Sequence, residues 1–168
     1  MAWTKERVFL FMGIFAAAAL WQTSIFNPLK IWHIVPDLFL IIVVYFNLFG
    51  LNSQGMWCAL GAGLLEDTLS GSPLGQAALS KVLAACATIL LGNQMVPDNP
   101  VVQSLLVFTI SILESTFRLF LIVNFSESIS FGWDITWRLI LPQAFFTALI
   151  TPIVFWLMGK GAKLMDNG

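Results

Sequence analysis

Residues 61–81 read GAGLLEDTLSGSPLGQAALSK. This stretch places two adjacent carboxylates, Glu66 and Asp67, at the end of an apolar run and just before a turn of serine, glycine and proline. Proline cannot continue a helix, and glycine permits a tight reversal of the backbone. A lone lysine, Lys81, follows the turn. The stretch therefore predicts a helical hairpin that carries charged groups within an otherwise apolar sequence.

The composition around this hairpin is that of an integral membrane protein. Of the 168 residues, 58% are hydrophobic and only 10% are charged, which lies far from the soluble globular range. The net charge of −1 excludes a basic face for nucleic acid. Because a membrane-spanning helix needs about 20 apolar residues, we predict one all-α transmembrane domain, a six-span helical bundle over residues 1–168. The expected spans are residues 8–26, 36–51, 54–69, 76–95, 101–125 and 139–158.

The distribution of basic residues predicts the orientation of this bundle. Six spans place both termini on the same side of the membrane, and the terminal segments hold four basic residues, namely Lys5, Arg7, Lys160 and Lys163. The loops expected on the opposite side hold only Lys30 and Arg138. Since cytoplasmic segments carry an excess of lysine and arginine, we expect both termini to be cytoplasmic.

Two stripes of small residues predict close helix packing. Gly13 and Ala17 lie four residues apart in the first expected span, and Gly55, Ala59 and Gly63 follow the same spacing in the third. Small residues at this spacing let two helix backbones approach closely. Each stripe is therefore a candidate docking face, either for a partner helix or for another helix of this chain.

Charged residues from three expected spans fall at one depth. Glu114 and Arg118 are four residues apart and share a helix face, and Lys81 lies about 7 Å below the outer start of its span at 1.5 Å per residue. The expected cluster consists of Glu66, Asp67, Lys81, Glu114 and Arg118. An unpaired charge at such depth costs at least about 2.5 kcal/mol. The cluster is either an ion network that fixes helix packing or a polar cavity that binds a ligand or a partner segment.

Few residues suit catalysis or metal binding. Cys58 and Cys86 fall in expected spans and are interpreted as buried free thiols, and one histidine, His33, does not complete a zinc site. Two aspartates, Asp37 and Asp67, are typical of an intramembrane aspartyl peptidase, but the Asn-x-Ala-Asp signature of lipoprotein signal peptidase is missing. We therefore expect no catalytic residue, no cofactor and no metal, and hence no enzyme.

Two motifs carry a resemblance to a known family. Residues 36–40 read PDLFL, where a proline and an aspartate fit the start of a helix, and residues 66–75 read EDTLSGSPLG. With the length and the expected topology, these motifs resemble the MreD family of rod shape-determining membrane proteins. The positions that match are Pro36, Asp37, Asp67, Ser70, Gly71, Leu74 and Gly75.

The resemblance implies a non-enzymatic scaffold subunit of the bacterial cell-elongation (rod) complex in the cytoplasmic (inner) membrane. It implies a single-span partner, MreC, and through it MreB, RodA and a class B penicillin-binding transpeptidase, all acting in lateral peptidoglycan synthesis. We hypothesise that the MreC helix docks on a small-residue stripe.

The implied fold is similar to the S-components of energy-coupling-factor transporters. An alternative function is therefore capture of a vitamin or metal substrate by a true S-component. Such proteins carry paired Ala-xxx-Ala motifs, whereas the first expected span offers a continuous alanine block at residues 16–19.

Overall fold

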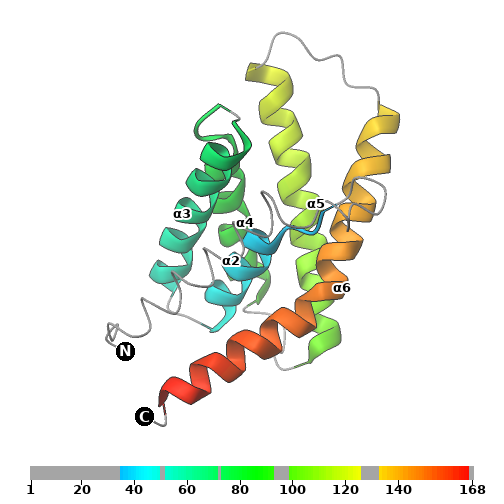
Figure 1. Ribbon diagram of the computed structural model, residues 1–168. Coiled ribbons are helices and arrows are strands. Elements are labelled where there is room, and N and C mark those ends of the chain that lie inside the picture. Colours follow the sequence, from blue (N-terminus) through cyan, green and yellow to red (C-terminus); the bar gives the residue numbers. More distant parts are fainter. Residues whose placement is uncertain (1–34, 50–51, 72, 93–98, 126–132, 167–168) are drawn as a thin grey trace.

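Five α-helices make up the part of the chain that the structure describes. The computed structural model describes residues 35–49, 52–71, 73–92, 99–125 and 133–166, and within these ranges there is no β-strand. The helices are α2 (Leu38–Phe49), α3 (Asn52–Ser70), α4 (Gln76–Gly92), α5 (Pro100–Phe125) and α6 (Trp133–Asp166) (Figure 1). The all-α prediction is confirmed. The expected first span, residues 8–26, lies outside the described residues.

The helix bounds match the expected spans to within a few residues, except at α6. This helix has 34 residues and extends beyond the expected span, 139–158, at both ends. It contains two prolines, Pro142 and Pro152, and Figure 1 shows it changing direction along its length. An internal proline has this effect because it removes a backbone donor and its ring crowds the preceding turn.

Two helices are long and apolar enough to cross a membrane by length and composition. These are Pro100–Asn124 in α5 and Arg138–Lys160 in α6, whereas α2 and α4 are shorter apolar helices. At 1.5 Å per residue, the 12 residues of α2 extend about 18 Å, compared with a hydrocarbon core of about 30 Å. Helix α2 alone is therefore too short to cross a bilayer.

Helix α2 lies inside the bundle. Its sequence, LFLIIVVYFNLF, is apolar on nearly every face, which is typical of a helix that is buried all round. Residues 39–44 are each at most 2% exposed. One face of α2 packs against Ala59 of α3, and the opposite face packs against Val107 of α5. The other helices are thus arranged around this short central element.

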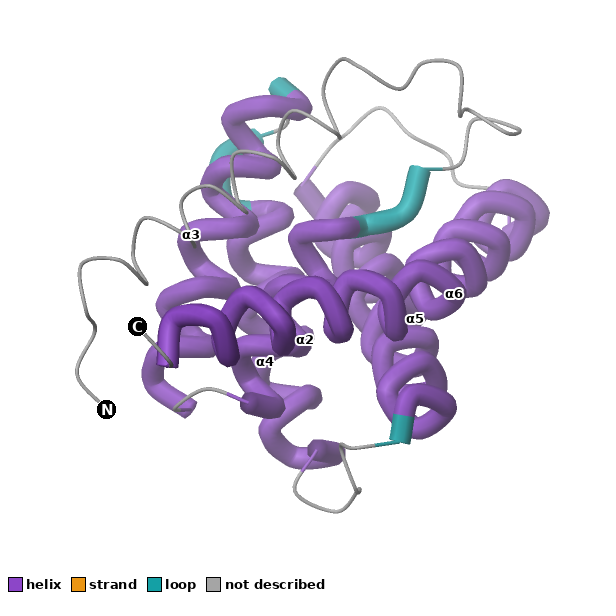
Figure 2. The backbone as a smooth tube through the Cα atoms, turned by 60° about the horizontal axis from the view of Figure 1, so that its bottom comes forward, coloured by secondary structure: helices purple, strands orange, loops and turns teal. Residues whose placement is uncertain are grey.

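The C-terminal half of α6 crosses the end of α2 (Figures 1 and 2). Tyr45 of α2 meets Phe155 of α6 edge to face, with ring centroids 5.3 Å apart, and Phe49 lies 5.0 Å from Tyr45. Edge-to-face pairs of this kind contribute about 0.5–1.5 kcal/mol beyond the area they bury. Helix α6 therefore covers the C-terminal end of α2.

The glycines of the α3 stripe let neighbouring helices approach closely. A Cβ atom on Gly63 would lie 2.3 Å from Cα of Ala78 in α4. On Gly55, a Cβ atom would lie 2.2 Å from Oδ1 of Asn47 in α2. Real Cβ atoms essentially never come so close to another atom. The contact at Gly63 is with backbone and therefore requires glycine, whereas at Gly55 the Asn47 side chain would have to move.

This result decides between the two alternatives for the third-span stripe. Gly55 and Gly63 contact other helices of the chain, and Ala59 between them is fully buried. The stripe is therefore used for packing within the chain, and it is not available to a partner helix. The other stripe, Gly13 and Ala17, lies outside the described residues.

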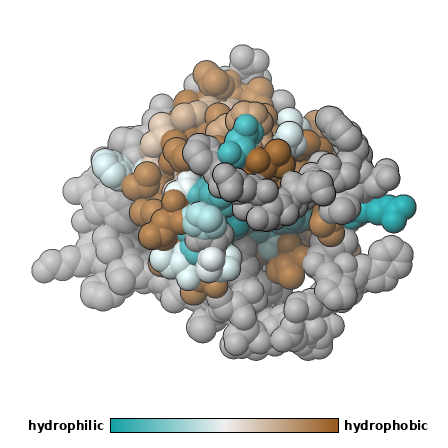
Figure 3. All heavy atoms as spheres, turned by 90° about the horizontal axis from the view of Figure 1, so that it is seen from above, coloured by the Kyte–Doolittle hydropathy of each residue, from teal (hydrophilic) through white to brown (hydrophobic). Residues whose placement is uncertain are grey.

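Large apolar side chains cover much of the described surface. Trp57 of α3 is 74% exposed, and Val101 of α5 and Leu149 of α6 are also exposed. In the view from above, brown apolar atoms take up more of the described face than teal polar ones (Figure 3). Apolar exposure on this scale is typical of surfaces that lipid or a protein partner covers.

Candidate functional site

A buried network of five charged side chains joins four helices. Its members are Asp37 at the start of α2, Glu66 of α3, Lys81 of α4, and Glu114 and Arg118 of α5. The Lys81 side chain is fully buried at the centre. An ammonium group carries three hydrogens, and three carboxylates, each from a different helix or helix start, lie around this one. The network is thus built around Lys81.

The three carboxylates lie at different distances from the ammonium group. Nζ of Lys81 is 2.7 Å from Oδ2 of Asp37 and 2.8 Å from Oε2 of Glu66. Both distances are short for an ion pair, and the contact with Asp37 is also a hydrogen bond. Oε1 of Glu114 lies further away, at 3.5 Å. Asp37 and Glu66 are therefore the strong partners of Lys81, and Glu114 is the weak one.

Asp37 is also the N-cap of α2. Its Oδ1 atom accepts a hydrogen bond of 2.9 Å from the backbone N–H of Leu40. Its own N–H donates to Oγ1 of Thr147 in α6 over 3.1 Å. A carboxylate at this position satisfies a free helix donor and complements the helix dipole. The prediction that Asp37 begins a helix is confirmed, and the same side chain connects α2 with α4 while its backbone contacts α6.

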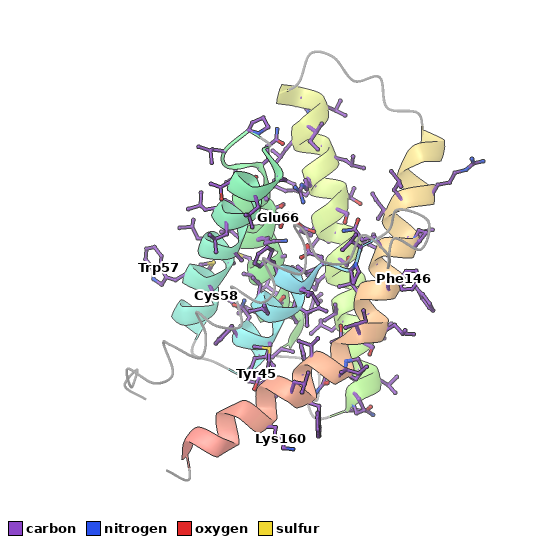
Figure 4. All side chains as sticks on the ribbon, viewed as in Figure 1. Tyr45, Trp57, Cys58, Glu66, Phe146 and Lys160 are labelled. Carbon is purple, nitrogen blue, oxygen red and sulfur yellow. The ribbon has the colours of Figure 1, made fainter. Side chains whose placement is uncertain are left out.

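Glu66 connects the two cations of the network. Its Oε1 atom accepts a hydrogen bond from Nη1 of Arg118, while Oε2 faces Lys81. Figure 4 shows Glu66 on the side of α3 that faces α5, whereas Trp57 on the same helix projects away from the bundle. Arg118 is the most exposed member, with 26% of its side chain accessible. The network therefore reaches the surface at Arg118 and is otherwise enclosed.

Asp67 has a different role from its neighbour. Its carboxylate accepts hydrogen bonds from the backbone N–H groups of Gly75, Ala77 and Ala78, at 2.8, 2.9 and 3.3 Å. These groups lie at the start of α4, where helix donors lack partners within the helix. The predicted cluster placed Asp67 with the other charges, but adjacent residues of a helix point about 100° apart. Asp67 instead ties the end of α3 to the beginning of α4.

The turn between α3 and α4 depends on two glycines. Gly71 and Gly75 have φ angles of 65° and 106°, in the region that side chains disfavour. Ser70 donates a hydrogen bond from its hydroxyl to the carbonyl oxygen of Glu66. Leu74, at the tip, is 73% exposed. The motif residues of this turn therefore set its backbone shape, except Leu74, which projects outward.

The arrangement does not resemble an aspartyl peptidase site. Such a site needs two carboxylates that share a proton, whereas Asp37 pairs with Lys81 and Asp67 caps α4. Cys58 and Cys86 are free, as predicted, but they are half-buried rather than buried. Among the described residues, no group of three histidine, cysteine or carboxylate side chains is placed to hold a metal ion. His33, the histidine considered as a zinc ligand, lies outside the described residues.

The structure brings together four of the five residues in the predicted cluster, namely Glu66, Lys81, Glu114 and Arg118. The sequence argument missed Asp37. A partial signal was present, because the expected span that Asp37 begins, residues 36–51, is short for a bilayer crossing.

Comparison with known proteins gives a family. The model of the family described as rod shape-determining protein MreD matches residues 4–160, nearly the whole chain. No curated protein and no solved structure matches the chain. MreD proteins are membrane-associated and determine cell shape, and they are not a known enzyme family. The chain belongs to the MreD family of rod shape-determining proteins.

Proposed function

We propose that this protein is a non-enzymatic scaffold subunit of the bacterial cell-elongation complex in the cytoplasmic membrane. In this role it docks an MreC-like single-span protein and so supports lateral peptidoglycan synthesis. Through that partner it contacts MreB, RodA and a class B penicillin-binding transpeptidase indirectly. The observation that carries the proposal is the family match over residues 4–160. The same match favours this role over capture of a vitamin or metal.

The contacts of the buried charges support a scaffold. The carboxylates of Asp37 and Glu66 hold Lys81 and Arg118, and Asp67 binds backbone N–H groups. Each of these groups is engaged in holding helices together. A catalytic site requires a reactive group with access to substrate, whereas Lys81 and Asp37 are buried and paired. The contacts of the network therefore suit a role in holding the helices in place better than a role in catalysis.

The proposed architecture has six spans. Residues 8–26 provide the first span, and the five described helices provide the others, with a fold like that of an energy-coupling-factor S-component. Among them α2 is shorter than the hydrocarbon core, so it crosses only as an enclosed part of the bundle and together with the residues that flank it. The two long apolar helices, in α5 and α6, support membrane insertion. The basic residues near both ends of the sequence favour cytoplasmic termini.

The proposed docking face is the stripe that contains Gly13 and Ala17. The stripe on α3 is occupied by packing against α2 and α4, which leaves the first span as the candidate with small residues at the right spacing.

Cysteine crosslinking tests this proposal. Cys58 and Cys86 are first replaced by alanine, and Ala17→Cys and Ala59→Cys are then introduced separately. Both new cysteines are paired with a series of single cysteines along the helix of the MreC-like protein. We expect Ala17→Cys to form crosslinks at helical spacing, and Ala59→Cys to form none because residue 59 is fully buried.

Two outcomes count against the proposal. If the complex forms but Ala17→Cys gives no periodic crosslinks, the docking face is wrong. If the MreC-like protein does not co-purify with the wild-type chain at all, the scaffold role itself is wrong.

A further inference from the structure

Among the side chains that the structure describes, the buried network contains more negative than positive charge. Asp37, Glu66 and Glu114 supply three carboxylates, whereas Lys81 and Arg118 supply two cations. An uncompensated charge in an apolar interior is so costly that the group usually neutralises itself instead. We therefore expect one carboxylate of this network to be protonated and neutral.

Contacts with the cations single out Glu114. Asp37 is held by Lys81 at 2.7 Å and by a backbone N–H, and Glu66 is held by both cations. Glu114 has only the 3.5 Å contact with Lys81, although it is 2% exposed. Of the three carboxylates, Glu114 thus gains least from being ionised and is shielded from water.

A serine hydroxyl supplies an independent argument. Oγ of Ser80 lies 3.0 Å from the carbonyl oxygen of Ala77 and 3.0 Å from Oε1 of Glu114. A hydroxyl carries one hydrogen, so it makes one full hydrogen bond, and sharing that hydrogen between two oxygens weakens both contacts. A carbonyl cannot donate, so both contacts reach full strength only if Glu114 supplies a proton to Ser80.

The surroundings of Glu114 contain no further cation among the described side chains. Asp37, Glu66 and Lys81 approach it from three elements, and Arg118 lies one turn further along its own helix, α5. Helix α6 also packs on α5. Its described charged side chains, Arg138 and Lys160, are both exposed.

We propose that Glu114 is a neutral, protonated carboxylic acid in the folded protein and donates a hydrogen bond to Ser80. Asp37 and Glu66 then balance Lys81 and Arg118, and the network has no net charge. Glu114 contributes polar contacts to the network rather than a charge.

Infrared spectroscopy of the purified protein in detergent tests the proposal. A protonated carboxyl group has a C=O stretching band that is separate from the bands of carboxylates and that shifts in D₂O. We expect this band in the wild type at pH 7 and its loss in Glu114→Gln. The control variant is Glu127→Gln, in the polar stretch between α5 and α6, which should keep the band. Absence of the band from the wild type, or its persistence in Glu114→Gln, overturns the proposal.

Thermal unfolding gives a second readout that does not depend on the spectrum. Glutamine is neutral and its NH₂ group can still donate to Ser80, so Glu114→Gln should leave the Tm within about 2 °C of the wild type. Asp37→Asn removes an ionised partner of Lys81, and its decrease in Tm should be several times larger than that of Glu114→Gln. If Glu114→Gln lowers the Tm as far as Asp37→Asn does, Glu114 is ionised and the proposal is wrong.

Discussion

Nζ of Lys81 lies 2.7 Å from Oδ2 of Asp37, and both side chains are almost completely buried. The pair joins α4 to the start of α2, across 44 residues of sequence. Because Asp37 also caps α2, one carboxylate sets both where this helix begins and what it contacts. The position of the central helix in the bundle therefore depends on Lys81.

Replacing Lys81 with methionine should destabilise the protein strongly. The variant keeps most of the side-chain volume but leaves carboxylates buried without their cation. Loss of one partner from a buried pair costs about 3–5 kcal/mol, which corresponds to a fall in Tm on the order of 10 °C for a chain of this size.

The matched control for this substitution is Lys160→Met. Lys160 is exposed and lies over the ring of Trp156, 5.1 Å from its centroid. An exposed cation–π contact is worth about 0.5–1 kcal/mol, so this variant should unfold close to the wild type. Equal Tm values for the two variants, measured by thermal unfolding in the same detergent, would contradict the role given to Lys81.

Replacing Asp67 with asparagine should weaken the turn between α3 and α4. Asparagine has nearly the same shape, but it lacks the negative charge that holds three backbone N–H groups. Hydrogen bonds to a charged group contribute about 1.5–3 kcal/mol. We expect a loss of stability of that order, together with faster amide hydrogen exchange at Gly75, Ala77 and Ala78.

An adjacent residue provides the comparison for Asp67. Thr68 is exposed, and its hydroxyl donates only to the carbonyl oxygen of Leu65. Thr68→Ala should therefore change the stability by less than about 0.5 kcal/mol. If Asp67→Asn is equally mild, the carboxylate does not hold the start of α4.

Two glycines of α3 should respond to alanine with opposite signs. At Gly63 the new Cβ would lie 2.3 Å from Cα of Ala78, so α3 and α4 must separate, at a cost of about 1–3 kcal/mol for overpacking. At Gly61 no atom lies within 4 Å of the new Cβ. There alanine should stabilise the helix by up to about 1 kcal/mol, because it restricts the unfolded chain and favours helix. Thermal unfolding of both variants checks the prediction, and a harmless Gly63→Ala would refute the close approach.

Helix positions were largely predictable because apolar runs and turn residues are local signals. The proline at position 73 and the glycines beside it mark the reversal between α3 and α4. Helix α6 was predicted too short. Its first turn contains polar and aromatic residues, which are not typical of a membrane span. Its two prolines lie inside the helix and do not end it.

The sequence predicted the level along the helices at which the charged residues lie, but it did not predict which of their side chains pair. The rise per residue placed Glu66, Lys81 and Glu114 at one level, and the structure joins them. Which way each side chain points depends on how the helices are rotated, and sequence spacing does not give that rotation. For this reason Asp37, which was expected only to begin a helix, also entered the network, and Asp67, which was expected in the network, capped α4 instead.

We propose that the network around Lys81 holds the bundle in the form that an MreC-like partner binds. Co-purification of that partner with the tagged chain, from membranes in which both proteins are present, tests the claim most directly. The wild type and Lys160→Met should retain the partner in equal amounts, and Lys81→Met should lose most of it together with its thermal stability. Full retention of the partner by Lys81→Met, or its absence from the wild type, would contradict the claim.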